Sequence, residues 1–267
     1  MSVQRISSIT PTICRLMGIR PPEISTSDVL TTVINRAHRT IGGENIEKCL
    51  VFAPDAVGEY LFRDFAAEFE PVVRLAPLQV PLMSFFPPNT PVCFASMFTG
   101  APPEAHGIRK YERPVLTSDT LFDALAREGK KVAIAAVAGC SVSLIFLNRP
   151  IDYFIEENDS KVNERVLKLL GGEDYDFILA YNQGYDDALH RTTPSSEEAI
   201  EAMRRHIASF EELAEAFLTR YRGHKRLVLL APDHGAHVSP ETGKGAHGLD
   251  IPDDMEIRTF WGMYGTN

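Results

Sequence analysis

Positive charge is scarce in this 267-residue sequence. It has 27 lysines and arginines against 36 aspartates and glutamates, which gives a formal net charge of −9 and an isoelectric point near 5.4. A nucleic-acid polymer or an anionic membrane needs a basic face on its partner, so we expect neither as the main partner. An anionic small molecule would need positive charge of local origin, from metal ions or helix N-termini.

Long apolar runs and paired cysteines are also missing. No stretch approaches the about 20 apolar residues of a membrane span, and residues 1–22 hold no apolar run long enough for a signal peptide. Cys14, Cys49, Cys93 and Cys140 are far apart and form no CxxC pair, which argues against a zinc ribbon or a disulfide framework. We therefore expect a reduced, cytoplasmic protein.

The sequence does contain an alternation of apolar strands and amphipathic helices. Near-continuous apolar runs, typical of strands covered on both faces, occur at 48–55, 130–139, 175–182, 225–233 and 257–265. Amphipathic patterns predict helices at about 28–41, 56–69, 118–129, 161–170 and 195–222. This order predicts an α/β sandwich with a mostly parallel central sheet flanked by helices. No repeat, low-complexity tract or linker divides the chain, so we expect 1–267 to be a single domain.

Aspartate and histidine side chains, which are common metal ligands, follow three of the predicted strands. Asp55 ends the first strand, Asp186 and His190 follow 175–182, and Asp233 and His234 end 225–233. Sheets of this kind place their sites at the carboxyl ends of the strands. A D-x-x-x-H pair alone is more often a surface charge pair, although its four-residue spacing puts both side chains on one helical face.

A third histidine, His247, lies between glycines in the stretch GKGAHGLD. Three carboxylates and three imidazoles then form one constellation: Asp55, Asp186, His190, Asp233, His234 and His247. Two divalent ions with three protein ligands each would use all six and leave positions open for a nucleophile and a substrate. Mixed oxygen and nitrogen ligands favour zinc or manganese over calcium or magnesium.

Residues 87–111, PPNTPVCFASMFTGAPPEAHGIRKY, could present a nucleophile. Thr90, Cys93 and Ser96 lie within seven positions of one another. Thr90 precedes Pro91, which suits the first turn of a helix, where free N–H groups favour a phosphoryl oxygen. Ser96 would lie nearly two turns inside that helix, and Cys93 one turn inside without an adjacent base.

In order, the chain reads an aspartate after the first strand, then TPVCFASMFTGAPPEAHGI, DDALH, APDHG and KGAHGLD. Over about residues 48–250 this set of motifs resembles the alkaline phosphatase superfamily, in particular its type I phosphodiesterase/nucleotide pyrophosphatase branch. The resemblance implies an alkaline-phosphatase-like three-layer sandwich. Because the chain is short for the superfamily, little or no cap insertion is expected. A sulfatase is disfavoured, since no C-x-P-x-R signature surrounds Cys93.

The resemblance also implies which residues act together. One ion would be held by Asp186, His190 and His247. The other would be held by Asp55, Asp233 and His234, together with the nucleophile. In that branch the nucleophile lies nine residues before the threonine of the TG pair, and counting back from Thr99 gives Thr90.

The N-terminal stretch SSITPTICRLMGIRPP resembles a segment that relatives carry near their C-terminus, just after the strand that follows the last metal histidine. Here the chain ends with that strand. The likeness suggests a circularly permuted arrangement, with the N-terminal helix docked beside the final strand, 257–265.

These observations predict a two-metal-dependent phosphoric ester hydrolase, either a phosphodiesterase or a phosphatase. It would act on a small-molecule phosphate ester through a covalent phosphothreonine on Thr90. The nearest alternative is a phosphotransferase or mutase at the same site, and a non-catalytic metal-binding protein is a more distant one. No substrate-binding residue is predicted.

Overall fold

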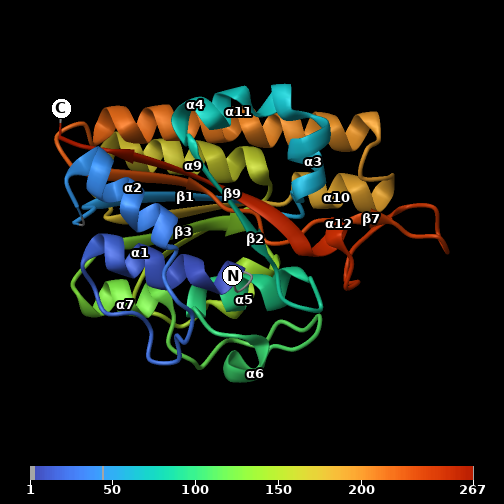
Figure 1. Ribbon diagram of the computed structural model, residues 1–267, viewed down its shortest axis with the longest axis horizontal. Coiled ribbons are helices and arrows are strands. Elements are labelled where there is room, and N and C mark those ends of the chain that lie inside the picture. Colours follow the sequence, from blue (N-terminus) through green and yellow to red (C-terminus); the bar gives the residue numbers. More distant parts are fainter. Residues whose placement is uncertain (1–3, 44, 267) are drawn as a thin grey trace.

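A seven-stranded sheet forms the centre of the computed structural model, which describes residues 4–43 and 45–266 (Figure 1). The strand order is β2-β9-β6-β1-β5-β3-β4. The strands from β6 to β4 pair in parallel, whereas β9 is antiparallel to both β6 and β2. The strands are β1 (Lys48–Pro54), β2 (Leu78–Met83), β3 (Val132–Val137), β4 (Asp152–Glu156), β5 (Phe177–Asn182), β6 (Arg226–Leu230) and β9 (Glu256–Tyr264), with β7 (His237–Val238) and β8 (Gly245–Ala246) forming a separate hairpin.

Helices cover both faces of the sheet and complete a three-layer α/β sandwich (Figure 1). One layer contains α9 and α11, which pack on the central strands, and the other contains α1, α5, α7 and α8. The helices are η1 (Ile6–Ser8), α1 (Ile9–Met17), α2 (Thr31–Ile41), α3 (Glu59–Asp64), η2 (Ala66–Phe69), α4 (Glu70–Leu75), α5 (Thr90–Thr99), α6 (Pro103–His106), α7 (Leu121–Arg127), α8 (Ser141–Ile145), α9 (Asp159–Gly172), α10 (Gly184–Arg191), α11 (Glu197–Arg220) and α12 (Pro252–Met255). The predicted fold class is confirmed.

The five predicted strands are present within a few residues of their expected bounds, as β1, β3, β5, β6 and β9. Two further strands, β2 and β4, were not predicted, and both lie at the edges of the sheet. Their residues are only partly buried, so they lack the continuous apolar run of a central strand. Pro81 within β2 is tolerated because an edge strand has ladder positions without a partner. The single helix predicted at 56–69 is also wrong, because α3 ends at Asp64 and η2 follows as a separate turn.

The N-terminal segment lies beside the β2–β9 edge of the sheet. Arg5 forms an isolated parallel bridge with Met83 of β2, and α2 packs on β9. The helix that carries the N-terminal motif, α1, packs mainly on α5, α2 and α7. The contact with β9 is made by α2, which lies outside the N-terminal motif, so the docking of the motif's helix beside the last strand stays a prediction, as does the circular permutation.

The sheet order brings the predicted site residues to one place. Strand β1 is flanked by β5 and β6, so the carboxyl ends of these three parallel strands are adjacent. The backbone N–H of Asp55, just beyond β1, donates to the carbonyl of Asn182 at the end of β5 (2.9 Å). None of the helices in the described ranges combines the length and the apolar character that a membrane span requires.

Candidate active site

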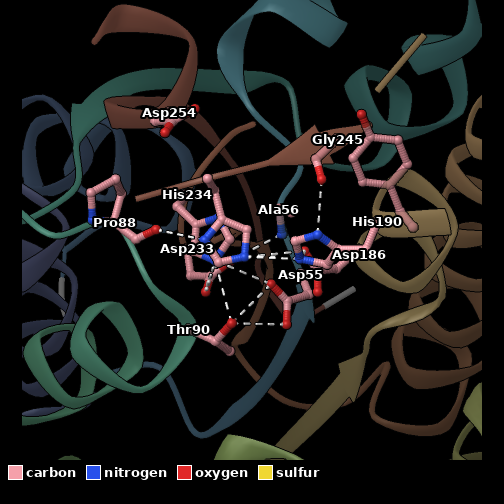
Figure 2. A network of polar contacts seen from close by, with 12 residues as sticks. Asp55, Ala56, Pro88, Thr90, Asp186, His190, Asp233, His234, Gly245 and Asp254 are labelled. Carbon is pink, nitrogen blue, oxygen red and sulfur yellow. Dashed lines mark hydrogen bonds and ion pairs between the residues drawn. The ribbon is translucent and has the colours of Figure 1, made fainter. Parts of the chain in front are cut away.

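The seven predicted site residues come together at the carboxyl ends of β1, β5 and β6 (Figure 2). Asp55 follows β1, α10 carries Asp186 and His190 after β5, and Asp233 and His234 follow β6. Two further segments complete the arrangement. The start of α5 presents Thr90, and the loop after β8 presents His247.

Asp186, His190 and His247 form the first potential metal group, with one ligand atom from each residue lying within 4.8 Å of the others. Nε2 of His190 lies 3.3 Å from Oδ1 of Asp186, and Nε2 of His247 lies 3.6 Å from the same oxygen. The two imidazole Nε2 atoms are 3.2 Å apart. The helical spacing of Asp186 and His190 thus places both side chains on one side of α10, as predicted.

Asp55, Asp233 and His234 form the second group, and all three are buried. Nε2 of His234 lies 3.4 Å from Oδ1 of Asp55 and 3.3 Å from Oδ2 of Asp233. The Thr90 hydroxyl lies against this group, 3.3 Å from Oδ2 of Asp55 and 3.3 Å from Nε2 of His234. The rings of His234 and His247 are 4.2 Å apart between centroids, so the two groups are neighbours.

All three histidines have their Nδ1 atom against a backbone carbonyl. His190 faces the carbonyl of Gly245 (3.1 Å), His234 that of Gly235 (2.9 Å) and His247 that of Pro88 (3.0 Å). A carbonyl only accepts, so Nδ1 carries the proton and, in the neutral ring, Nε2 is left with a lone pair. This is the usual outer contact of a metal-binding histidine.

The Nε2 lone pairs therefore point at carboxylate oxygens and at one another. Acceptors that face acceptors repel unless a cation lies between them. Oδ1 of Asp186 and Oδ2 of Asp233, one from each group, are buried and receive no hydrogen bond. In the part of the chain that the structure describes, no lysine or arginine forms an ion pair with Asp55, Asp186 or Asp233. The residues present fit two metal ions.

Burial and crowding shift the pKa values of four of the six residues, whereas the hydrogen bond between Asp186 and His190 raises the pKa of His190 and, against the effect of burial, lowers that of Asp186. Burial and the neighbouring charges of Asp233 and Asp186 raise the pKa of Asp55 well above its usual value. Burial also raises the pKa of Asp233, to about 6, and lowers the pKa values of His234 and His247. Neutral imidazoles are the form that binds a metal, and a dication would offset the repulsion among the carboxylates.

Of the three possible nucleophiles, only Thr90 lies against a metal group. It is the first residue of α5, as predicted, with Pro91 in the first turn and Asn89 as the N-cap. Cys93 is fully buried, and burial raises the pKa of its thiol well above the usual value, which keeps it protonated. Ser96 donates to the carbonyl of Val92 (2.9 Å) inside the same helix.

Several residues that the sequence analysis missed hold these groups in place. The Tyr181 hydroxyl donates to Oδ2 of Asp55, and the N–H of Ala56 donates to Oδ1 of Asp233 (3.1 Å). Ala56 has a left-handed backbone (φ 62°), which costs free energy in a non-glycine residue and turns the chain directly after Asp55. Tyr181 was read as part of an apolar strand, and no sequence signal identified its hydroxyl.

The start of α10 is fixed by Asp159, from a different helix. Its carboxylate accepts the backbone N–H groups of Gln183 (3.0 Å) and Gly184 (2.8 Å) and also contacts Nε2 of His206 (3.1 Å). Asp159 thus satisfies N–H groups that a helix leaves free at its N-terminus. This contact orients the helix that carries Asp186 and His190.

His106, which belongs to the HGI motif, serves the structure and lies in neither metal group. Its Nδ1 accepts the N–H of Ile108 (3.3 Å), and its Nε2 lies 2.9 Å from the Ser96 hydroxyl. Burial lowers its pKa from 6.5 to about 4. His106 therefore holds α5 to the following turn in its neutral form.

The free energy of unfolding should depend on pH through this buried histidine. The unfolded chain binds a proton at His106 below about pH 6.5, whereas the folded chain does so only near pH 4. Above pH 6.5 the free energy of unfolding is unaffected by this proton. As the pH falls from 6.5 toward 4, the free energy of unfolding decreases by about 3 kcal/mol, because the unfolded chain binds the proton more strongly. Urea unfolding at several pH values should show this loss in the wild type and less of it in His106→Gln. An equal loss in both proteins would contradict the assignment, and the exposed His38→Gln serves as the control.

A cavity of about 450 Å³ opens at the two groups, and Asp55, Thr90, Asp186 and His247 line it. Its lining also includes the exposed side chains of Tyr111 and Arg113, which the sequence does not mark as site residues. A larger cavity of about 590 Å³, between α9 and α11, is lined by none of the seven predicted residues. The ligand geometry, rather than cavity size, therefore locates the candidate site.

Comparisons with known proteins identify the family and the fold. The profile of the family described as type I phosphodiesterase / nucleotide pyrophosphatase matches residues 59–260. No curated protein matches the sequence. Murine ectonucleotide pyrophosphatase/phosphodiesterase 5, as an inactive threonine-to-alanine variant in complex with AMP, is similar in structure with a TM-score of 0.60 at 12% identity over 82% of this chain and 88% of that chain.

Two further solved structures share the fold. Phosphonoacetate hydrolase from Sinorhizobium meliloti 1021, in complex with phosphonoformate, has a TM-score of 0.53 at 18% identity over 74% of this chain. The match spans only 59% of that hydrolase. A 2-O GAG sulfatase has a TM-score of 0.57 at 11% identity, over 81% of this chain and 64% of that chain.

Proposed function

Because the chain belongs to the type I phosphodiesterase/nucleotide pyrophosphatase family, we propose that it hydrolyses phosphoric esters with the help of two divalent metal ions. One observation carries the proposal. Three carboxylates and three Nε2 lone pairs converge in two groups beside the hydroxyl of Thr90, at the N-terminus of a ten-residue helix. The catalytic domain would comprise residues 1–267.

The proposed metal ligands divide between the two groups. Asp186, His190 and His247 would hold one ion. Asp55, Asp233 and His234 would hold the other, with Thr90 as a further ligand. The mixture of carboxylate and imidazole ligands favours zinc, with manganese as the alternative. When bound, the ions would lower the pKa of the attacking hydroxyl and neutralise charge on the phosphoryl oxygens.

The chain's own residues then perform a two-step displacement. Oγ1 of Thr90 forms a bond to phosphorus, its proton is released to solvent, and the bond from phosphorus to the leaving oxygen breaks. The leaving alcohol takes a proton from solvent. Water next attacks the phosphothreonine, the bond between phosphorus and Oγ1 breaks, and Thr90 regains its proton as the phosphate product departs.

Several features favour Thr90 in this role. Asp55 and His234 fix its hydroxyl at the edge of the cavity, and the N-terminus of α5 offers a positive dipole end to a phosphoryl oxygen. The similar murine protein is inactive as a threonine-to-alanine variant. The same phosphothreonine could pass its group to a second alcohol, which is the transferase alternative.

The proposal predicts metal-dependent hydrolysis of simple esters. The metal-free protein, supplied with zinc or manganese, should release nitrophenol from an aryl phosphate monoester or diester, and a chelator should abolish the release. With a substrate labelled in its phosphate and an added alcohol, hydrolysis gives labelled phosphate, whereas a transferase gives a labelled phosphate ester of the added alcohol. No release from either ester class with either metal would contradict the proposed hydrolase.

A further inference from the structure

Arg113 lines the cavity that contains carboxylates and imidazoles from the two potential metal groups. It is the only lysine or arginine among the residues that line this cavity, which also include Asp55, Asp186 and Asp187. In the described part of the chain, Arg113 forms no ion pair with any carboxylate. An arginine that points to a substrate cavity without a charged partner is available to a charged ligand.

Two contacts hold the Arg113 side chain in place. Its Nη1 donates to the carbonyl of Gly139 (2.6 Å), at the turn after β3, and its guanidinium lies 5.8 Å from the centre of the Tyr111 ring. Pro114 restricts the backbone of Arg113 to extended conformations. These contacts restrict the exposed side chain before a ligand arrives, so less entropy is lost on binding.

The donors of Arg113 remain largely free. Guanidinium has five N–H donors, and the Gly139 carbonyl accepts from Nη1 alone. The reacting phosphoryl group would lie at Thr90, between the two metal groups. Arg113, on the segment between α6 and α7, lines the same cavity together with the Tyr111 ring, and both side chains are exposed to solvent whereas Thr90 is buried.

We propose that Tyr111 and Arg113 form a second anion subsite, which binds a negatively charged group of the substrate other than the reacting phosphoryl. The proposal rests on the proposed function for the location of the phosphoryl group. The chemistry recognised is a planar or tetrahedral oxyanion, that is, a carboxylate or a further phosphate, bound by two N–H groups of the guanidinium. The Tyr111 ring supports the guanidinium by a cation–π contact. Esters with this additional charge would bind more tightly than neutral ones of the same size.

Binding of phosphonates with non-hydrolysed C–P bonds tests the subsite without turnover. We would titrate the zinc-loaded protein with ethylphosphonate, with 3-phosphonopropionate, and with ethane-1,2-bisphosphonate in a calorimeter. Ethylphosphonate has no second anionic group. In 3-phosphonopropionate the second anionic group is a carboxylate, and in ethane-1,2-bisphosphonate it is a phosphonate. The wild type should bind at least one of the doubly charged ligands roughly tenfold more tightly than ethylphosphonate.

Arg113→Ala should remove this preference and leave the affinity for ethylphosphonate within about twofold, while Arg113→Lys should restore part of it. Arg109→Ala is the matched control, because Arg109 is also exposed and also donates to a backbone carbonyl, that of Glu104 (3.3 Å), but does not line the cavity. A wild type without the preference, or an Arg113→Ala variant that keeps it, would overturn the subsite.

The test of the anion subsite and the test of ester hydrolysis can succeed or fail independently. An Arg113-dependent preference in a protein that hydrolyses no ester would support the subsite and contradict the hydrolase. Hydrolysis without the preference would support the hydrolase and contradict the subsite.

Discussion

Replacing Thr90 by alanine should lower ester hydrolysis by about 10⁴-fold or more, because the variant lacks the oxygen that attacks phosphorus. The metal content should stay near that of the wild type, since each group keeps its three other ligands. The thermal midpoint should change little, because the substitution removes one small polar side chain from the first turn of α5. Initial rates, metal analysis by mass spectrometry and thermal unfolding check the three expectations together.

The neighbouring candidates provide the controls for this result. Thr90→Ser keeps a hydroxyl at the same position and should keep part of the activity. Cys93→Ala should keep most of it, because the buried thiol of Cys93 contacts the Phe85 carbonyl (4.0 Å) and belongs to neither metal group. Full activity in Thr90→Ala would refute the nucleophile assignment. Selective loss in a stable Cys93→Ala protein would instead make Cys93 the nucleophile.

Removing one carboxylate from each group should separate the two metal sites. The wild type should bind two ions per chain, whereas Asp186→Asn and Asp233→Asn should each retain about one. Activity should fall by roughly 10³-fold in both variants, because a bound ion contributes several kcal/mol of charge stabilisation. Metal titration of the chelator-treated protein, followed by rate measurements, gives both quantities. Metal binding should also raise the thermal midpoint, since the ions bind the folded state preferentially.

Asp187→Asn is the matched control for Asp186→Asn. The two residues are adjacent on α10, but Asp187 belongs to neither potential metal group and contacts Gln183 instead (3.2 Å). Its variant should still bind two ions. Two ions per chain in both Asp186→Asn and Asp233→Asn would show that these carboxylates are not ligands. A loss of metal in Asp187→Asn would contradict the assignment of residues to the two metal groups.

Apolar runs and helical spacing were sufficient to predict much of the fold. The central strands β1, β3, β5 and β6 are covered on both faces, so their sequences are almost continuously apolar. Such runs can be recognised as strands from the sequence alone. The edge strands β2 and β4 are half exposed, and their mixed sequences carry no such signal. Their pairing depends on β9 and β3, which lie elsewhere in the chain.

The amino-acid sequence by itself predicted the seven residues that meet at the candidate site, because five of them directly follow strands or keep the spacing of one helical turn, and the sequence motifs add Thr90 and His247. Asp55, Asp186 and Asp233 needed only the rule that sites lie at the carboxyl ends of parallel strands. Which of these residues meet one another depends on sheet order, which short-range patterns do not specify. Strand β1 had to lie between β5 and β6 before the two groups could meet.

Only the tertiary structure decided how the side chains are oriented and charged. The carbonyls of Pro88 and Gly245 direct the Nε2 atoms of His247 and His190 inward, and both contacts join segments distant in sequence. Arg113 likewise donates to the Gly139 carbonyl, 26 positions away, and both residues line the cavity. Burial and long-range contacts set protonation and direction, and both arise only when the chain has folded.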